Sequence, residues 1–273
     1  MLNSEVERIG RAAITALYDE LALAPKPGLV SFADAGSHTD MDASTFMRSL
    51  FALRHYFQAI AMLGVVRAPF AELEALGISA EARMLAATGG INTHRGAVFA
   101  LGLLSAAAGI GAGQLGAREL REALMATWGD ALRARLGRVS MSNGQRAARA
   151  HRLRGAGEEA ALGFPVVFNL AVPALARARR QGLDDQRARL QTLFEIIAVL
   201  ADTNLAHRGG LEGLHFAQAQ ARAFLRAGGA ARPDALAHAQ TIHRAFVARR
   251  LSPGGAADVL AAACFVERVC LRA

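Results

Sequence analysis

The chain has 273 residues, of which 53% are hydrophobic and only 6% aromatic, and its formal net charge is +8. Its length suffices for one domain over residues 1–273, no apolar run reaches the roughly 18 residues of a membrane span, and the first residues lack the form of a signal peptide, so we expect a cytoplasmic protein without a membrane partner. The basic balance favours an anionic partner, but the low aromatic content and the lack of a basic tail argue against nucleic acid.

Helical periodicity and breaks rich in glycine or proline alternate along the chain. Apolar residues recur at helical spacing over 5–23, after which Pro25, Pro27 and Gly28 end the helix. Asp42 stands where an N-cap residue is expected, directly before the next periodic segment. In the first half of the chain we expect helices over 43–66, 71–87, 117–128, 131–136 and 145–153, a glycine-rich turn over 106–116 and a loop over 137–144.

The second half continues the same pattern, with helices expected over 165–179, 185–200, 214–227, 233–249 and 256–271. No segment has the period-two alternation of a half-buried strand. Cys264 and Cys270 lie close together on the last of these helices, so we expect neither a disulfide framework nor a zinc site. The sequence therefore predicts an all-α fold, a single multi-helix domain in which polar, glycine-rich clusters at helix starts form the site.

The first of these clusters is Gly89-Gly90-Ile91-Asn92-Thr93-His94-Arg95-Gly96, which directly precedes an apolar helix. The beginning of a helix offers unpaired N–H groups and a positive dipole end, which suit an anion such as phosphate. Asn92 and Thr93 can equally serve as ordinary helix caps. Taken alone, this cluster leaves both interpretations open.

Other polar clusters hold similar positions. His38-Thr39-Asp40-Met41-Asp42 has carboxylates two residues apart that can reach one Mg²⁺ ion. Asp202-Thr203-Asn204, with Arg208 shortly after it, has a content similar to that of the first cluster, and Glu159 and Asp258 add acids near helix starts. Lys26, the one lysine among 31 basic residues, supplies a compact point charge. Together the clusters predict a site for magnesium and a polyphosphate, without a Walker A motif.

Several of these motifs, in this order, resemble the triphosphoribosyl-dephospho-CoA synthase family from about Asp19 to Asp258. The resemblance rests on Pro25-Lys26-Pro27-Gly28-Leu29-Val30, Gly36-Ser37-His38-Thr39-Asp40-Met41-Asp42, Thr88 to Gly96, Gly163-Phe164-Pro165, Asp202-Thr203-Asn204, Arg208-Gly209-Gly210 and Ser252-Pro253-Gly254-Gly255. Gly157-Glu158-Glu159 stands where the family often has Arg-Gly-Glu, which leaves no arginine for a role there. Ser31-Phe32-Ala33-Asp34 is closer to the malonate decarboxylase branch than to the citrate lyase branch.

The resemblance implies a transferase that joins ATP to 3′-dephospho-CoA and releases adenine. The 2′-hydroxyl of dephospho-CoA would attack C1′ of the ATP ribose, through a transition state with oxocarbenium character. The product would pass to a transferase that loads the acyl carrier protein of malonate decarboxylase or citrate lyase. The sequence leaves the oligomeric state open, so a homo-oligomer is one expectation.

On this basis each polar cluster receives a hypothetical role. His38, His94 and Glu159 are candidates for the catalytic base, among which the sequence does not choose. The expected binding residues for phosphate and ribose are Lys26, Asn92, Thr93, Arg95, Thr203, Asn204 and Arg208, and the expected magnesium ligands are Asp40, Asp42 and Asp202. Two alternatives remain open, a magnesium-dependent nucleotide or ADP-ribosyl hydrolase and a non-enzymatic helical carrier-binding module.

Overall fold

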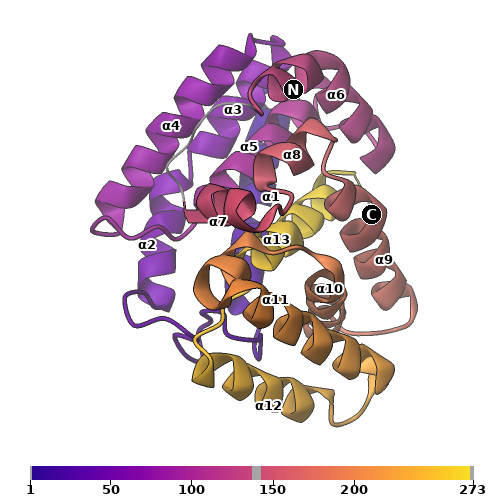
Figure 1. Ribbon diagram of the computed structural model, residues 1–273. Helices are drawn as coiled ribbons and strands as arrows, with labels where there is room; N and C mark the ends of the chain where they lie inside the picture. The colour runs from indigo at the N-terminus through magenta and orange to yellow at the C-terminus, as the bar shows by residue number, and fades with distance from the viewer. Residues whose placement is uncertain (1, 137–142, 271–273) are drawn as a thin grey trace.

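The computed structural model describes residues 2–136 and 143–270, which form helices and connecting turns without any strand (Figure 1). The predicted all-α fold class is therefore confirmed. None of the helices in the part of the chain described here is long and apolar enough to cross a membrane. The helices share one continuous apolar core, to which nearly every helix contributes buried residues.

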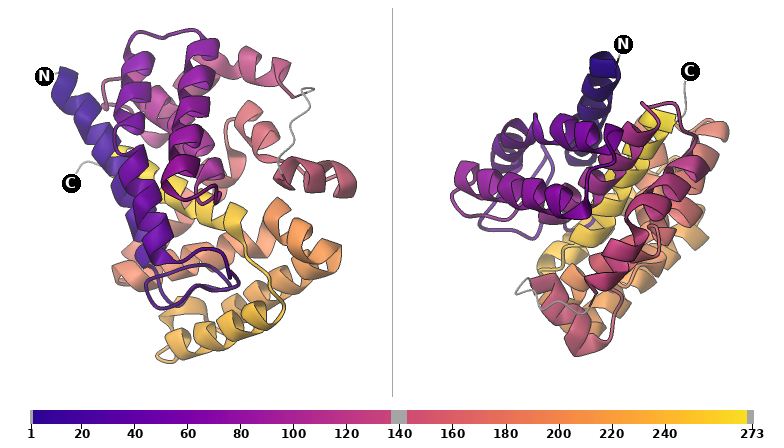
Figure 2. Two further views of the ribbon diagram at one scale, coloured as in Figure 1. Left: turned by 90° about the vertical axis from the view of Figure 1, so that its left-hand side faces the viewer. Right: turned by 90° about the horizontal axis from the view of Figure 1, so that it is seen from above.

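Four helices form the centre of the molecule. They are α1 (Leu2–Ala22), α3 (Tyr56–Val65), α5 (Arg95–Ile110) and α13 (Gly254–Cys270). The first packs against α3 and α13, and α5 packs against the same two helices. Helix α5 is buried along most of its length because its sequence is apolar on every side. In the two further views, α13 runs between the earlier and the later helices of the chain (Figure 2).

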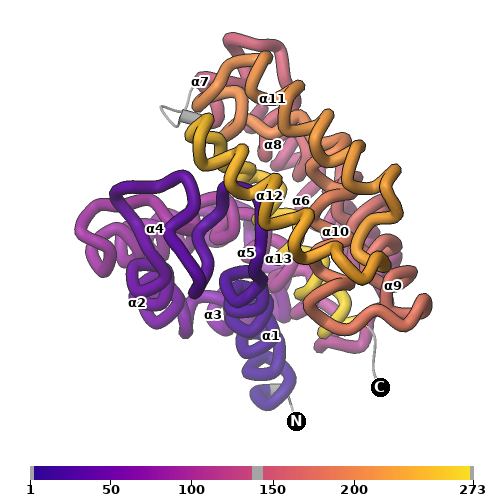
Figure 3. The backbone as a smooth tube through the Cα atoms, turned by 90° about the horizontal axis from the view of Figure 1, so that it is seen from below, coloured from indigo at the N-terminus to yellow at the C-terminus, as the bar shows by residue number. Residues whose placement is uncertain are grey.

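The remaining helices form two groups on either side of this centre (Figure 3). The first group comprises α2 (Ala43–Leu53) and α4 (Phe70–Ala87), while α6 (Ala117–Ala134) packs against α5 and α8. The second comprises α7 (Asn143–His151), α8 (Ala156–Ala161), a π-helical turn (Val167–Ala171) continuing into α9 (Val172–Arg180), α10 (Asp185–Val199), α11 (Thr203–Arg226), a 3₁₀ turn (Gly229–Ala231) and α12 (Ala235–Ala248). Helix α8 of the second group packs against the central helix α5 and against α6.

The single helix predicted over 43–66 is wrong, because the chain turns at Arg54 and His55 and forms two helices. No glycine or proline lies at this break, so tertiary packing imposes it. Helix α2 packs against α4, whereas α3 packs closely against α5. A Cβ on Gly64 would lie 1.8 Å from the Ala106 carbonyl oxygen, so the two backbones of α3 and α5 touch.

Three other boundaries differ from the sequence prediction. The turn predicted over 106–116 begins only after Ile110, because the small, apolar residues before it remain buried in α5. The helices predicted over 117–128 and 131–136 are one helix, α6, in which the buried Gly129 is accommodated. Helix α11 begins at Thr203 and is kinked at Gly210, well before the predicted start at 214. The loop predicted over 137–144 falls mainly outside the described residues.

Candidate active site

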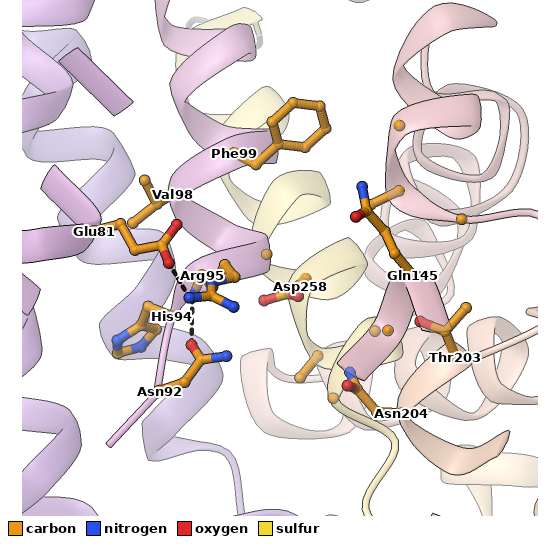
Figure 4. A pocket seen from close by; sticks show the side chains of 18 of the residues that line it. Glu81, Asn92, His94, Arg95, Val98, Phe99, Gln145, Thr203, Asn204 and Asp258 are labelled. Carbon is orange, nitrogen blue, oxygen red and sulfur yellow. Dashed lines mark hydrogen bonds and ion pairs between the residues drawn. The ribbon is translucent and has the colours of Figure 1, made fainter. Parts of the chain in front are cut away.

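A cavity of about 2020 Å³ lies between the two groups of helices. It is larger than the roughly 300–1,000 Å³ usual for one small-molecule site. Helices α5, α7, α8, α11 and α13 all begin at its wall, and their first residues line it. Figure 4 shows Asn92, His94 and Arg95 on one wall, Gln145, Thr203 and Asn204 on the opposite wall, and Asp258 between them. The glycine-rich starts of α7, α8 and α13 therefore face the same space as the first predicted cluster.

The start of α5 is held by local contacts that the sequence explains. Gly89 and Gly90 have φ values of 69° and 87°, a region that other residues rarely adopt, and they reverse the chain after α4. The Asn92 side-chain oxygen accepts a 3.1 Å hydrogen bond from the Arg95 N–H. Arg95 also forms an ion pair with Glu81 of α4 (Figure 4). Asn92 therefore supplies the acceptor for the first N–H of α5, and the Ala97 N–H in the same turn donates to Asp258.

Three consecutive side chains at this helix start carry polar atoms that are buried without a hydrogen-bond partner. They are Thr93 Oγ1, His94 Nε2 and Arg95 Nε, and all three residues line the cavity. Buried polar atoms are normally satisfied, so a concentration of unsatisfied ones in a cavity points to a polar ligand. The other ring nitrogen of His94, Nδ1, lies 2.6 Å from Ser49 Oγ. Burial, with a contribution from Lys26, lowers the pKa of His94 to about 3, so its imidazole is neutral at physiological pH.

The starts of α11 and α13 are joined by one carboxylate. Asp202 Oδ1 accepts hydrogen bonds from the Asn204 and Leu205 N–H groups, at 2.8 and 3.3 Å, and thereby caps α11. Its Oδ2 accepts a 2.9 Å hydrogen bond from the Ala256 N–H in the first turn of α13. The residue is only 2% exposed, and a Cβ on Gly255 would lie 3.1 Å from its carboxyl carbon. Asp202 therefore fixes the two helix starts relative to each other.

A second set of charged groups lies on α1, on α13 and in the loop after α1. Lys26 is only 1% exposed, and its ammonium donates hydrogen bonds to Glu20 Oε1 at 2.5 Å and to the Glu20 carbonyl at 2.6 Å. Glu20 in α1 and Asp258 in α13 both line the cavity. Burial raises the pKa of Asp258 well above its usual range, and the nearby charges of Glu20 and Asp202 raise it further. A Cβ on Gly96 would lie 2.0 Å from Asp258 Oδ2, so glycine at the start of α5 admits this carboxylate.

The loop before α2 brings His38 and Asp40 to another part of the wall. His38 Nε2 lies 3.0 Å from Ser252 Oγ, and His38 Nδ1 lies 3.7 Å from Asp40 Oδ1. Burial and the neighbouring Arg208 lower the pKa of His38. Arg208 itself donates a 3.0 Å hydrogen bond to the Ser37 carbonyl. This loop, α11 and the residues before α13 therefore lie side by side at the cavity.

Nine of the thirteen side chains that the sequence assigns to the site line the cavity, and four do not. Those lining it are His38, Asp40, Asn92, Thr93, His94, Arg95, Thr203, Asn204 and Arg208. Lys26 lies beneath Glu20, and Asp202 is enclosed by helix starts. Asp42 caps α2 by accepting a 2.8 Å hydrogen bond from the Thr45 N–H, as predicted. Glu159 accepts hydrogen bonds from Arg154 and from the Val166 N–H, while its neighbour Glu158 faces the cavity.

Sequence reasoning gave Glu20 no role and left Asp258 without one, although both reach the cavity. The signal for Glu20 was indirect, because the one lysine in the chain needs an acidic partner when it is buried. The signal for Asp258 was its position shortly after Gly254-Gly255, within the first turns of α13. The signal for Asp258 identifies no neighbour without knowing that α1 and α13 lie side by side, whereas Glu20 stands only six residues before Lys26.

The described residues offer few ligands for a magnesium ion. In the part of the chain that the structure describes, no three His, Cys, Asp or Glu side chains cluster closely enough to hold a metal by themselves. Magnesium at nucleotide sites needs only one or two carboxylates, because substrate phosphates and waters supply the other ligands. Of the three predicted metal ligands, Asp40 alone lines the cavity, and its side chain is 59% exposed. Asp40 is therefore the predicted ligand placed where it could meet a magnesium ion whose other ligands are phosphates and waters.

The cavity wall carries both charged and apolar side chains. Its apolar side chains are Phe70, Leu73, Ile78, Phe99, Leu103, Leu132, Leu136, Leu153 and Leu162. Arg135, which also lines the cavity and pairs with Glu74, lies 4.2 Å over the Phe70 ring. Ile78 is 65% exposed, Leu162 50% and Leu136 46%, so three large apolar side chains lie open to solvent around one cavity. Such a surface suits a ligand with both a polyanionic part and an uncharged chain.

Comparison with known proteins gives a consistent result. A family model described as ATP:dephospho-CoA triphosphoribosyl transferase matches residues 6–272. A relative from Acinetobacter calcoaceticus, named "Probable 2-(5''-triphosphoribosyl)-3'-dephosphocoenzyme-A synthase", is 40% identical over 98% of this chain and 93% of its own length. A relative of the same name from Azotobacter vinelandii is 41% identical over 97% of this chain and 92% of its own length.

A third relative, from Klebsiella pneumoniae, is named "2-(5''-triphosphoribosyl)-3'-dephosphocoenzyme-A synthase". It is 39% identical over 97% of this chain and 96% of its own length. No solved structure matches the chain.

Proposed function

The chain belongs to the ATP:dephospho-CoA triphosphoribosyl transferase family, and on this premise we propose that the cavity between α5, α11 and α13 is where ATP and 3′-dephospho-CoA react. The enzyme is a transferase that forms 2′-(5″-triphosphoribosyl)-3′-dephospho-CoA and releases adenine. The observation that carries the proposal is that several helix starts and three unsatisfied polar side chains converge on one large cavity. A single polyphosphate ligand accounts for both features.

The triphosphate of ATP lies against the helix starts that line the cavity. The positive ends of the α5, α11 and α13 dipoles favour its charge, and Arg95 and Arg208 neutralise it. Thr93 Oγ1 and His94 Nε2 line the same cavity and would bind phosphate or ribose oxygens, since neither has a hydrogen-bond partner among the residues that the structure describes. Asn204 lies against Gly254, where a Cβ would be 2.7 Å from its side-chain nitrogen, so its amide is held beside the start of α13.

The pantetheine arm of dephospho-CoA lies along the apolar side chains of the cavity wall. This arm is uncharged and long, whereas the nucleotide part of the acceptor is anionic. The apolar wall around Ile78, Phe99 and Leu162 matches the arm, and the helix starts match the nucleotide. Such a placement brings the acceptor ribose close to the triphosphate, where the donor ribose must lie.

Magnesium completes the donor site in this proposal. Asp40 would hold the ion together with the triphosphate, and the ion would neutralise phosphate charge. The chain's own residues bind the triphosphate, orient the two riboses and surround them with protein. Asp42 and Asp202 contribute by fixing the starts of α2, α11 and α13, which leaves their carboxylates engaged with backbone N–H groups.

The fate of the product is a further part of the proposal. The product is the precursor of a prosthetic group, so a second transferase must attach it to an acyl carrier protein. We assign that carrier to malonate decarboxylase rather than citrate lyase because Ser31-Phe32-Ala33-Asp34 resembles the former branch. Incubating the product and the loading transferase with each of the two carrier proteins tests the assignment. Equal or preferential loading of the citrate lyase carrier would contradict it.

The proposed activity has a direct test. The protein is incubated with ATP and magnesium, with and without 3′-dephospho-CoA, and free adenine is measured by chromatography. We expect adenine only when the acceptor is present, in a one-to-one ratio with the coupled product. Adenine formed equally without the acceptor would favour a nucleotide hydrolase, and adenine formed in neither case would contradict the transferase assignment.

A further inference from the structure

Two carboxylates that line the cavity remain without a role in the binding scheme. Glu20 is 5% exposed and Asp258 is half-buried, and both line the cavity. They come from α1 and α13, helices far apart in the sequence that pack side by side. His94 also lines this cavity, and its Nε2 atom has no hydrogen-bond partner among the described residues, which indicates that a polar ligand binds here. These carboxylates are therefore placed to meet a reacting group.

The two carboxylates have opposite surroundings. Glu20 receives a 2.5 Å hydrogen bond from the buried ammonium of Lys26. Asp258 has no cationic partner among the described residues; the groups that act on it are the acidic Glu20 and Asp202 and the Ala97 N–H. The neutral His94 lies on the adjoining start of α5. Pairs of carboxyl groups in contrasting environments are characteristic of acid–base catalysis.

We propose that Asp258 is the general acid that protonates the departing adenine and that Glu20 is the base that accepts the proton of the attacking 2′-hydroxyl, with Lys26 as the residue that positions Glu20. This inference rests on the proposed function. It is supported by Gly96, where a Cβ would lie 2.0 Å from Asp258 Oδ2. The start of α5 is thus shaped around the Asp258 carboxylate itself.

The step balances without any further reactant. The bond between C1′ of the ATP ribose and N9 of adenine breaks, and its electron pair leaves with adenine. The Asp258 carboxyl proton passes to a ring nitrogen of that adenine. The 2′-oxygen of dephospho-CoA forms a bond to C1′, and its proton passes to Glu20. One proton is thereby moved from Asp258 to Glu20, and exchange with solvent restores both groups before the next cycle.

The test uses a donor that does not need the acid. In the triphosphate of N7-methyladenosine the base already carries a positive charge, so it leaves without being protonated. We expect Asp258→Asn to lower kcat with ATP by roughly 100- to 10,000-fold and to retain most of its activity with the N7-methyl donor. Glu20→Gln should lose activity with both donors, because both still require a base.

Several outcomes would overturn the assignment. Equal losses of Asp258→Asn with the two donors would contradict the acid role, and so would recovery of its activity by manganese or excess magnesium, which would indicate a metal ligand. Retained activity of Glu20→Gln with either donor would contradict the base role. Lys26→Met should lower kcat with both donors in the same way as Glu20→Gln. If it lowers only the melting temperature and leaves kcat unchanged, Lys26 does not position Glu20.

The wild-type enzyme provides a second measurement that is independent of how the variants fold. With ATP, kcat/KM should fall as the pH rises and Asp258 loses its proton, whereas the N7-methyl donor should not show this fall. Profiles of the same shape for the two donors would contradict the proposal. Failure of the wild-type enzyme to release adenine in an acceptor-dependent way would instead contradict the proposed function, so the two failures are distinguishable.

Discussion

At the scale of single residues, some buried polar side chains have all their hydrogen bonds within the fold, whereas others have an atom without a partner that a ligand can bind. Asp202 satisfies backbone N–H groups of two helices and has no further capacity directed at the cavity. His94 is held through one ring nitrogen and leaves the other unpartnered. The sequence treated both as site residues, because a capping side chain and a binding side chain have the same composition and the same position before a helix.

The double cap of Asp202 predicts a large loss of stability on truncation. Asp202→Ala leaves helix-start N–H groups of both α11 and α13 without their acceptor, so we expect the free energy of unfolding to fall by about 2 to 4 kcal/mol. Urea denaturation measures the change. Asp184→Ala is the matched control, because Asp184 caps only α10 through the Arg187 N–H. A loss for Asp202→Ala no larger than the control's would show that the link between the two helices contributes nothing.

The neutral state of His94 predicts a dependence of stability on pH. Its pKa of about 3 in the folded protein lies below the usual value of 6.5. Between these two pH values the unfolded chain therefore binds a proton at His94 that the folded protein does not bind. Stability should therefore fall as the pH drops from 6.5 toward 3, and this residue accounts for about 3 kcal/mol of that loss at pH 4. Comparing urea denaturation of the wild type with His94→Gln at pH 7 and pH 4 checks this. An equally steep fall in the variant would contradict it.

At the scale of elements, close contacts between helix backbones explain the break that the sequence missed. Gly64 and Gly109 allow α3 and α5 to touch, and a Cβ at Gly109 would lie 2.0 Å from the Ala61 carbonyl oxygen. Apolar periodicity continues across Arg54 and His55, so periodicity alone predicts one helix. The turn is imposed by tertiary packing, because α2 packs against α4 whereas α3 packs against α5.

The close contact at Gly64 predicts that alanine there is destabilising, whereas alanine at Gly77, outside the contact, is not. Gly64→Ala places a methyl group 1.8 Å from the Ala106 carbonyl oxygen, a backbone atom that cannot move alone. We expect a loss of at least about 2 kcal/mol in unfolding free energy. Gly77→Ala in α4 meets only Tyr56 Oη at 3.5 Å and should be neutral or stabilising by up to about 1 kcal/mol. Urea denaturation of both variants measures the two changes in unfolding free energy. Equal changes would contradict the close packing of α3 and α5.

The apolar wall predicts a change in acceptor affinity alone. Ile78→Asn should raise the KM for dephospho-CoA roughly 5- to 10-fold, because the pantetheine arm loses an apolar contact, and should leave the KM for ATP unchanged. Val66→Asn is the matched control, since Val66 is 66% exposed, close to the 65% of Ile78, but does not line the cavity. A rise in the KM for ATP instead would place the donor, not the acceptor, at this wall.

At the scale of the whole molecule, the sequence predicted the fold class and most of the polar clusters that the fold brings together. The start of a helix can be predicted from the sequence because capping residues and glycines directly precede a segment with apolar residues at helical spacing. The pairing of Lys26 with Glu20, and of Glu20 with Asp258, could not be predicted in this way. Glu20 and Asp258 come together through the side-by-side packing of α1 and α13, which no local pattern encodes. Lys26 and Glu20 are only six residues apart, but helical periodicity does not show that the chain folds back after α1, and the lone lysine was therefore assigned to phosphate.

The convergence of helix starts on one cavity is the central claim, and a crystal structure of the enzyme with its product, 2′-(5″-triphosphoribosyl)-3′-dephospho-CoA, tests it most directly. We predict that the triphosphate lies against the first turns of α5, α11 and α13, that the pantetheine arm lies along Ile78 and Phe99, and that the newly joined riboses lie beside Asp258 and Glu20. Product bound outside this cavity, or with its triphosphate remote from those three helix starts, would contradict the account.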